Sequence, residues 1–351
     1  MKNKKSASLY ITAGLIITIL YIIFAIKPLG EEFQFVPEWK IDITNPTIEQ
    51  SDEKKHPFKL GQSMGYFTDS GKVTSFISFP FKATISENIY ASYMENNSSC
   101  DFFSCNGEKI GTINEYGFPF FDEDRLFIFY PGGNAFARLD ENGKKLWEYE
   151  NSAPITAFDS SENGCVAGFA DGSITQFDKN GKILQQFSPG GSEFQIISGA
   201  AISSDGEFVA TVSGQNKERF VLARREDAHS KIIFHEFSDN SKPYQKLVKF
   251  SKDNSKVYYD FCGKLGIADT KKCKATHLNI KGQAISLKEN DLCVFLLTKN
   301  KNEYTIYVIE KNSSLTGKFS FTANSAFIQT YDNMLFVGKD STISKINILK
   351  K

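Results

Sequence analysis

A turn-like motif recurs along this chain at nearly constant spacing, and it limits the possible folds more than any other feature. The stretch DENGKKLWEYE at residues 140–150 returns as DKNGKILQQFS at residues 178–188, and shorter copies stand at 106–113 and 70–77. Each copy contains one glycine at the same place: Gly71, Gly107, Gly143 and Gly181. These glycines are 36, 36 and 38 residues apart, and self-similarity at such a period indicates a repeat architecture.

A second landmark, an acidic or asparagine-containing turn, recurs with a similar period. Seven acidic residues mark it: Glu87, Glu123, Glu162, Asp205, Asp253, Glu289 and Asp332. Successive members are 36 to 48 residues apart. One unit contains four strand-length runs, at residues 154–160, 165–170, 173–178 and 182–188, separated by turns rich in Gly and Asn. Four-stranded units at this period are typical of the blades of a β-propeller.

The second run of most units is apolar along its whole length, as in RLFIFY at residues 125–130 and FVATV at residues 208–212. A strand that is apolar on both faces must be covered on both faces. Blades stacked face to face provide that cover. The pattern therefore favours an all-β propeller over the two alternatives, a generic β-sandwich and a solenoid.

The number of blades follows from the inner strands. Seven are expected, starting near Phe81, Phe118, Pro154, Ile197, Lys246, Gly282 and Ser325. The last unit ends after three strands at residues 342–349, and a spare strand at residues 72–79 precedes the first unit. Pairing of these two segments would close a seven-bladed ring and remove two open sheet edges. The alternative is an eighth, irregular blade built from residues 33–69.

The N-terminal segment predicts a membrane anchor. Residues 7–26 contain no charged side chain, and a helix of that length spans about 30 Å, the thickness of the bilayer core. Three lysines precede it: Lys2, Lys4 and Lys5. The positive-inside rule therefore predicts a single-pass protein of a bacterial-type inner (plasma) membrane, with its C-terminal body on the non-cytoplasmic, periplasmic side. The alternative is a cleaved secretory signal.

These patterns predict four segments. Residues 1–6 form a cytoplasmic N-terminus, and residues 7–26 form the transmembrane signal-anchor helix. Residues 27–61, with four spread prolines and a strongly polar stretch, form a tether, and residues 62–351 form the propeller domain.

The charge balance and the motifs argue against several classes of function. Lys plus Arg and Asp plus Glu number 41 each, so no net field attracts nucleic acid. The sequence contains no G-x-S-x-G, H-E-x-x-H or P-loop motif. His229 and His235 would lie about 20 Å apart on one outer strand, too far to share a metal ion. We therefore predict no catalytic, cofactor-binding or metal-binding residue, and no enzyme.

Six cysteines would invite disulfides in a body outside the cytoplasm. Cys100 and Cys105 would lie about 16 Å apart on an extended strand, beyond bridging range. Cys165 and Cys293 fall in apolar second strands and are expected to be small core residues. We expect mostly free thiols, a state that fits either side of a membrane.

The turn D-x-x-G-K-x-L-W at residues 140–147, with its echo at residues 178–184, resembles turns of the quinoprotein-like and WD40-like β-propeller superfamily. The resemblance covers about residues 62–351 and is greatest to noncatalytic members such as the propeller lipoprotein of bacterial outer-membrane assembly. The chain departs from the WD40 pattern because no Gly-His and Trp-Asp pair marks its blades. It also lacks the cysteine to which a lipid would be attached.

Quinone-dependent members of this superfamily hold their cofactor beside a calcium ion, between a tryptophan and a disulfide. Trp39 is expected in the tether and Trp147 on an outer strand, so neither is placed to stack on a quinone. The resemblance therefore implies no cofactor for this chain.

A binding scaffold at the cell envelope is the expected function, with envelope or outer-membrane assembly as its process. The fourth unit is the longest, and its charged segments at residues 213–220 and 223–231 are expected to be loops. They supply the predicted partner-binding residues Arg219, Arg224 and Arg225. The expected partners of the monomeric body are envelope or membrane proteins. The alternative is an enzyme or sensor that binds a metal, a quinone or another small ligand at the channel.

Overall fold

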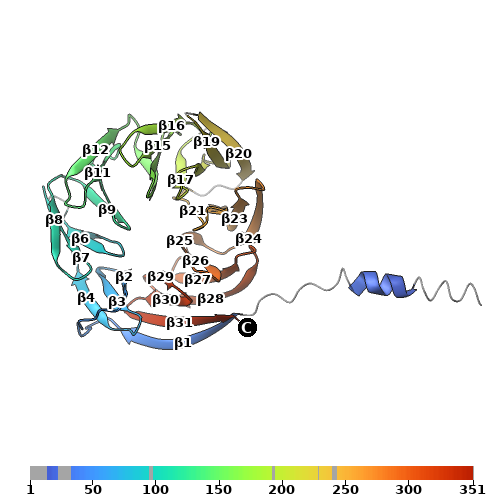
Figure 1. Ribbon diagram of the computed structural model, residues 1–351, viewed down its shortest axis with the longest axis horizontal. Helices are drawn as coiled ribbons and strands as arrows, with labels where there is room; N and C mark the ends of the chain where they lie inside the picture. The colour runs from blue at the N-terminus through green and yellow to red at the C-terminus, as the bar shows by residue number, and fades with distance from the viewer. Residues whose placement is uncertain are drawn as a thin grey trace, which may run out of the picture. The chain divides into compact units, whose positions relative to one another are not determined.

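The computed structural model describes residues 14–22, 33–94, 98–191, 194–227, 229–238 and 243–350. These residues form 31 strands in eight sheets, together with one helix at residues 14–22. The chain divides into two compact units, one of Met1–Gln34 with Leu349–Lys351 and one of Phe35–Ile348. In the larger unit the sheets stand around a central axis as the blades of a β-propeller (Figure 1).

Blades 1 to 4 follow one another along the chain. Blade 1 is β2 (Lys55–Leu60), β3 (Ser63–Thr68) and β4 (Val73–Ser78). Blade 2 is β5 (Lys82–Ile85), β6 (Ile89–Tyr93), β7 (Cys100–Ser104) and β8 (Lys109–Ile113). Blade 3 is β9 (Phe118–Asp122), β10 (Arg125–Phe129), β11 (Ala135–Leu139) and β12 (Lys145–Glu150). Blade 4 is β13 (Ile155–Ser161), β14 (Gly164–Phe169), β15 (Ile174–Asp178) and β16 (Ile183–Phe187).

Blades 5 to 8 complete the ring. Blade 5 is β17 (Ile197–Ile202), β18 (Phe208–Ser213), β19 (Glu218–Glu226) and β20 (His229–Ser238). Blade 6 is β21 (Val248–Phe250), β22 (Lys256–Phe261), β23 (Lys264–Asp269) and β24 (Lys274–Asn279). Blade 7 is β25 (Gln283–Glu289), β26 (Cys293–Asn300), β27 (Glu303–Glu310) and β28 (Leu315–Thr322). Blade 8 is β29 (Ala326–Tyr331), β30 (Met334–Lys339), β31 (Thr342–Lys350) and β1 (Phe33–Asp42).

The predicted repeat is confirmed. Each of the seven expected inner strands begins within a few residues of its predicted start, from β5 to β29. The apolar second strand is covered on both faces, and in blade 4 all six residues of β14 are buried. Apolar side chains of neighbouring blades share common cores, as do those of blades 2 and 3 around Phe102 and Leu126. Removal of this surface from water is the main stabilising contribution to the ring.

The recurring glycines lie in the turn that joins the last two strands of blades 1 to 4. All four have φ between +83° and +88°, a left-handed conformation that favours glycine. At two of these turns a tryptophan from the outer strand of the preceding blade packs on the glycine. Trp147 of β12 donates its indole N–H to the Lys179 carbonyl beside Gly181, at 3.1 Å. A Cβ on Gly181 would lie 2.6 Å from the Trp147 ring, so the turn has no room for a side chain.

The predicted ring closure is wrong in its partner strand. The outer strand of the last blade does come from the N-terminal part of the chain, as predicted. That strand is β1, which pairs with β31, and not the spare strand at residues 72–79. That spare strand is β4, which pairs with β3 across the local turn at Gly71. A short hairpin costs less loop-closure entropy than pairing with the far end of the chain. The ring therefore has eight blades, the number that the alternative prediction gave. The additional blade is formed by residues 55–78 and not by residues 33–69, because β1 belongs to blade 8.

The seam between blades 8 and 1 contains residues of the segment predicted as a tether. Trp39 of β1 packs against Phe67 and Phe336, and its indole N–H donates to the Asp69 carbonyl at 2.9 Å. His56 of β2 is buried here, 2.7 Å from the Asp69 carboxylate. Burial lowers the pKa of His56 below 6.5, although the bond to Asp69 opposes this shift. Residues 27–61 thus contribute β1 and β2 to the ring.

The predicted membrane localisation is contradicted by the structure. Within the predicted span 7–26, only residues 14–22 are described, and the helix they form is about 14 Å long, half of what a bilayer core requires. Among all described residues, no helix has the length and apolar character needed to cross a membrane. The single-pass anchoring predicted above is therefore not supported. Residues 1–6 lie outside the described residues.

Candidate binding site at the channel mouth

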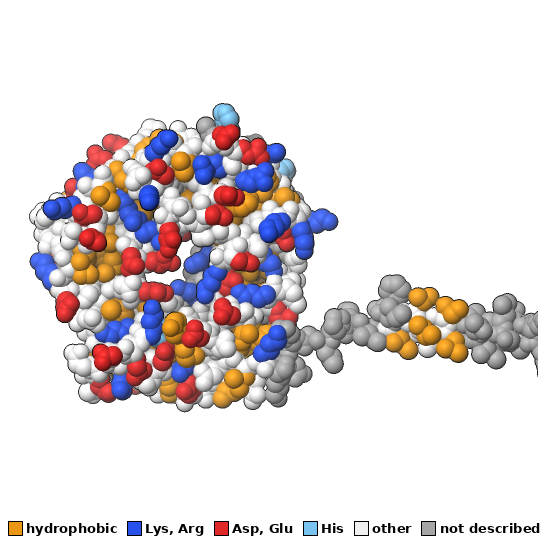
Figure 2. Space-filling view, in the orientation of Figure 1, with side chains coloured by type: hydrophobic (Ala, Val, Ile, Leu, Met, Phe, Trp, Pro, Cys, Tyr) orange, Lys and Arg blue, Asp and Glu red, His pale blue; other side chains and the backbone are white. Residues whose placement is uncertain are grey.

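The acidic turns that marked the repeat meet at one mouth of the central channel. Each turn joins the inner strand of a blade to its second strand, so the antiparallel pattern places all of them on the same face. They surround a cavity of about 490 Å³ that is lined by residues of blades 2 to 8. Figure 2 shows charged side chains gathered around this opening, with acidic and basic groups on different sides. We call this cavity and its lining residues the channel mouth.

Hydrogen bonds between neighbouring turns fix the rim of the channel mouth. The amide of Asn88 donates to Asp124 at 2.7 Å, and the amide of Asn163 donates to the Ser204 carbonyl at 2.6 Å. Asn254 donates to the Ser204 hydroxyl at 2.8 Å, and the backbone N–H of Lys252 donates to Glu289 at 3.0 Å. Each bond joins two successive blades. The lining side chains therefore project from a rigid frame.

Arg125 organises the carboxylates of blade 3. Its guanidinium donates to Asp122 at 2.9 Å and to Glu123 at 2.7 Å. The same group also donates at 2.9 Å to the Ser160 hydroxyl of blade 4, which in turn donates to Asp122 at 2.5 Å. Arg125 is 9% exposed, so its charge is held beside these carboxylates with little competition from water.

Asp159 of blade 4 is the most perturbed acid of the channel mouth. Burial raises the pKa of this carboxyl to about 7, although the Ile202 N–H donates to it at 2.9 Å. The negative charge of Asp122 adds to the rise. A carboxyl with such a pKa changes its charge near neutral pH.

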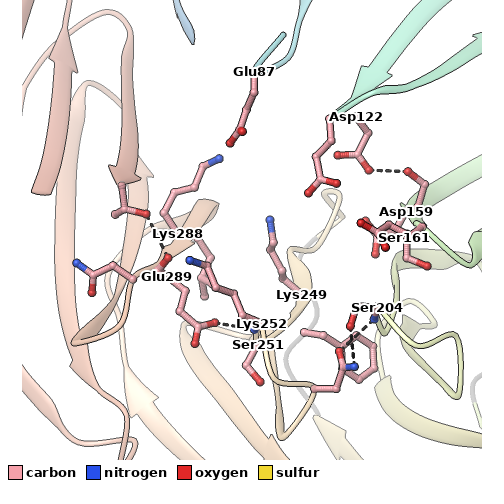
Figure 3. A pocket seen from close by; sticks show the side chains of 18 of the residues that line it. Glu87, Asp122, Asp159, Ser161, Ser204, Lys249, Ser251, Lys252, Lys288 and Glu289 are labelled. Atoms are coloured by element: carbon pink, nitrogen blue, oxygen red, sulfur yellow. Dashed lines mark hydrogen bonds between the residues drawn. The ribbon is translucent and has the colours of Figure 1, made fainter. Parts of the chain in front are cut away.

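Three lysines, Lys249 and Lys252 of blade 6 and Lys288 of blade 7, line the opposite side of the channel mouth. Figure 3 shows Lys249 directed into the cavity and Lys288 extending toward Glu87. None of the three ammonium groups forms an ion pair with any residue that the structure describes. Burial, followed by the charge of Lys249, lowers the pKa of Lys288 to about 8.

The channel mouth is therefore bipolar. We call its acidic members on blades 2 to 4 the acidic arc: Glu87, Asp122, Glu123, Asp159 and Glu162. We call Lys249, Lys252 and Lys288 the lysine group. Three further acids lie on the side of the lysine group. Glu289 is occupied by Lys311 and the Lys252 N–H, while Asp291 and Asp332 are exposed.

A second charged cluster lies at the other end of the blades and is buried. Lys246, which precedes β21, has its ammonium 2.9 Å from Glu218 of β19, and both side chains are almost fully buried. The contact is an ion pair without hydrogen-bond geometry. Asp260 of β22 is also fully buried and accepts a 3.3 Å bond from the Ala284 N–H and a 3.4 Å bond from the Tyr244 hydroxyl. Burial raises the pKa of Asp260, and the charge of Lys246 opposes that rise.

The predicted partner-binding arginines all lie on β19 of blade 5 but do not form one patch. Arg219 is near the start of the strand, where it donates to the Pro189 carbonyl and lies over the Phe237 ring. Arg224 is exposed near the other end, about 16 Å away along the strand, and pairs with Glu226 at 2.9 Å. Arg225 lies beside it and donates its backbone N–H to the Glu207 carbonyl. Only Arg224 and Arg225 therefore share the face of the channel mouth.

The segment 223–231, expected to be a loop, is largely strand. β19 continues to Glu226 and β20 begins at His229, so the extra length of this unit extends a hairpin. In the segment 213–220, half of the residues belong to β18 and β19, and residues 214–217 form the turn between these strands. The alternating side chains of β19 and β20 pair across the hairpin in regular register, as Arg224 does with Lys231. Residues that pair in a ladder satisfy their backbone groups and form strand despite their charge.

The described residues contain no group of three His, Cys, Asp or Glu side chains arranged to hold a metal ion. His229 and His235 lie on β20, as expected for one outer strand. All six cysteines have free thiols, and Cys165 and Cys293 are buried core residues, as expected from their apolar strands.

Sequence reasoning found the acidic turns but not the site. Glu87, Glu123 and Glu162 were recognised as markers of a repeat, and residues at one repeat position must converge in a closed ring. That convergence was the available signal for the acidic arc. The lysine group gave a weaker signal. Lys249 and Lys288 stand at the same repeat position, two residues before Ser251 and Asn290, but the equivalent residues Thr84 and Ala201 of other blades are not basic.

Comparisons with known proteins agree with this architecture. A family model described as beta-propeller protein matches residues 1–351. The chain is 28% identical over 361 residues to an uncharacterized protein of Treponema pallidum (strain Nichols), and the match covers 99% of this chain and 96% of the relative. The matched lengths include residues 33–350, which contain all the strands of the ring.

Solved structures with similar folds have low sequence identity. BamB from Moraxella catarrhalis is 10% identical with a TM-score of 0.59, and the match covers 90% of this chain and 98% of BamB. Sqt1 from Saccharomyces cerevisiae is 9% identical with a TM-score of 0.63, at 90% and 99% coverage. A chain of the mitotic checkpoint complex is 13% identical with a TM-score of 0.51, at 92% and 94% coverage. At these identities the likeness shows the fold alone.

Proposed function

Because the chain belongs to the beta-propeller protein family, we propose that it is a protein-binding scaffold whose binding face contains the channel mouth. One observation carries this proposal. Side chains of seven blades present a bipolar set of charges on a frame that interblade hydrogen bonds hold rigid. A preorganised surface of this kind loses little conformational entropy on binding.

The alternative is a small ligand at the same place. A cavity of about 490 Å³ is within the range of small-molecule sites, and charged groups do converge there, as that alternative requires. The polar lining favours the scaffold, since small-molecule sites are mostly apolar with few polar groups. An enzyme would need a substrate or cofactor that the described residues select, and we propose none.

Envelope proteins are the first partner class to test, a finer proposal supported by the fold likeness to BamB and by the resemblance of the repeat turns. One similar chain comes from a protein complex, the mitotic checkpoint complex. This supports protein partners in general for such folds. The roles of Arg219, Arg224 and Arg225 also remain proposals, and the first of these would belong to a different surface.

Crosslinking in intact cells followed by affinity purification through the propeller tests the scaffold. We expect the full chain to recover one protein reproducibly, and the variant Lys249→Ala/Lys252→Ala/Lys288→Ala to lose it. The matched control Lys274→Ala/Lys318→Ala changes exposed lysines on outer strands of the same two blades and should retain the partner. Loss of the partner in Arg224→Ala/Arg225→Ala alone would move the binding surface to the rim of blade 5.

Failure of the full chain to recover any protein would contradict the scaffold. Saturable binding of a small molecule to the purified propeller, abolished by the same lysine variant, would then establish the alternative. Both outcomes use one set of variants, so the two functions are distinguished directly.

A further inference from the structure

At the channel mouth, the lysine group faces the acidic arc across the cavity without forming ion pairs with it (Figure 3). Like charges repel, and Lys249 is close enough to Lys288 to lower the pKa of its ammonium. No described carboxylate forms an ion pair with the lysine group, although surface lysines elsewhere in the chain do form such pairs. Strongly perturbed groups that face a cavity indicate a binding site.

We infer that the occupant of the channel mouth is an extended peptide segment with an acidic side chain at the lysine group and a basic side chain at the acidic arc. This inference rests on the proposed function and specifies the partner's chemistry. The two sites are parts of a single cavity, so one segment must satisfy both.

The lysine group requires an anion. A carboxylate placed between Lys249, Lys252 and Lys288 would accept charge-assisted hydrogen bonds, which are about twice as strong as neutral ones. It would also relieve the repulsion between these ammonium groups. Their shared location on two adjacent blades, 6 and 7, keeps them on one side of the cavity.

The acidic arc requires a cation. Within the cavity lining, Arg125 is the only described cation that forms ion pairs with these acids, and it is bound to Asp122 and Glu123. Lys249 and Lys288 act on the arc only through their charge, without a direct ion pair. Glu87 has its ion pair with Lys54 at 4.0 Å, and Glu162 forms no ion pair with the described residues. A purely anionic occupant would be repelled by this side, as a purely cationic one would be by the lysines.

The size of the cavity limits the form of the occupant. About 490 Å³ accommodates a short segment but not a folded surface. An extended chain places successive side chains about 3.3 Å apart along its length, so two residues a few positions apart can reach opposite sides of the channel. A loop or terminus of the partner therefore inserts, while the rim contacts its surface.

Selection from a displayed library of random peptides tests this inference with the purified full chain. We expect enriched peptides to contain an acidic and a basic residue at fixed separation. Synthetic forms of these peptides should bind at least about tenfold more weakly when either charge is neutralised, because a charge-assisted hydrogen bond is lost. The variant Lys249→Glu/Lys288→Glu should select peptides without the acidic residue, whereas Lys274→Glu/Lys318→Glu should select the original pattern.

The outcomes separate the inference from the proposed function. Enriched peptides that lack one of the two charges, yet are lost in Lys249→Glu/Lys288→Glu, would overturn the inference and retain the channel mouth as the binding face. Peptides that bind equally to the wild-type chain and to this variant would overturn both. Circular dichroism of each variant, expected to match the wild-type strand signal, excludes loss of the fold as the cause.

Discussion

Replacement of Lys246 by methionine tests whether the buried charged cluster holds blades 5 and 6 together. The change keeps the length and the apolar stem of the side chain but removes its charge. The ammonium of Lys246 forms an ion pair with Glu218 at 2.9 Å and also lies 3.9 Å from the centre of the Tyr244 ring. Without it, the buried carboxyl groups of Glu218 and Asp260 would lose the positive charge that Lys246 places beside them.

The structure sets the size of the effect. Removal of one partner of a buried ion pair costs about 3–5 kcal/mol, because the remaining charge stays desolvated. Lys246 is fully buried and serves two carboxylates, so we expect the upper half of this range for Lys246→Met. The double variant Lys246→Met/Glu218→Gln removes one of the stranded charges, and we expect it to recover at least half of the loss.

Urea denaturation followed by tryptophan fluorescence and circular dichroism measures these differences. The folded-state pKa of Asp260 lies above its ordinary value of 3.8, and loss of Lys246 raises it further. The penalty of its ionised form therefore diminishes as the pH falls toward that pKa. Lys246→Met should be closer to wild type at pH 5 than at pH 8.

An exposed ion pair contributes at most about 1 kcal/mol to stability. A free energy of unfolding of Lys246→Met within that difference from wild type would therefore show that the buried charged cluster does not hold the two blades together. Equal losses at pH 5 and pH 8 would refute the assignment to stranded carboxylates. The control Lys318→Met changes an exposed lysine of β28 and should be neutral.

Three further predictions concern the seam and the channel mouth. Trp39→Ala should lower the free energy of unfolding, measured in urea, by about 3 kcal/mol. This is the lower end of the range for replacing a buried aromatic side chain by alanine, because Trp39 is only partly buried. An unchanged free energy of unfolding would contradict closure of the ring by β1. The pKa of His56 is lowered in the folded state, so protonation of this residue favours the unfolded state, and the free energy of unfolding of the wild-type chain should fall as the pH drops below 6.5. His56→Gln should reduce this dependence on pH, whereas the control His229→Gln should retain it. Because the pKa of Lys288 is about 8, the affinity for a selected acidic peptide should decrease between pH 7 and pH 9. Lys288→Arg should bind the peptide equally at both pH values, since arginine keeps its charge. An affinity of the wild-type chain that does not change with pH would contradict this prediction.

The blades themselves were predictable because their determinants are local. A positive-φ glycine, as at Gly143, and an alternation of strands and turns act within a few residues and need no distant partner. The fully apolar second strand, such as β14, predicted burial on both faces because periodicity depends on the backbone alone. Fold class, inner strands and repeat turns therefore followed from the sequence.

The outer strand of the closing blade had a signal that sequence reasoning did not use. Trp39 and Trp147 have equivalent roles, since each donates its indole N–H to a carbonyl in the turn of the next blade. The stretches EWKID and LWEYE that contain them are similar. Comparison of the two tryptophans would have assigned residues 33–42 to an outer strand.

Only the tertiary structure decided which ends of the chain meet and which charges share a cavity. Lys345 donates to the Asp69 carbonyl across 276 residues of sequence, and no local pattern specifies such a contact. The same holds for the lysine group opposite the acidic arc, and for Lys246 beside Glu218. Local interactions determined the repeating unit in this protein. The number of blades, the closing strand and the bipolar channel mouth depend on the angle at which each blade packs on the next, which is set by side-chain packing over the whole ring.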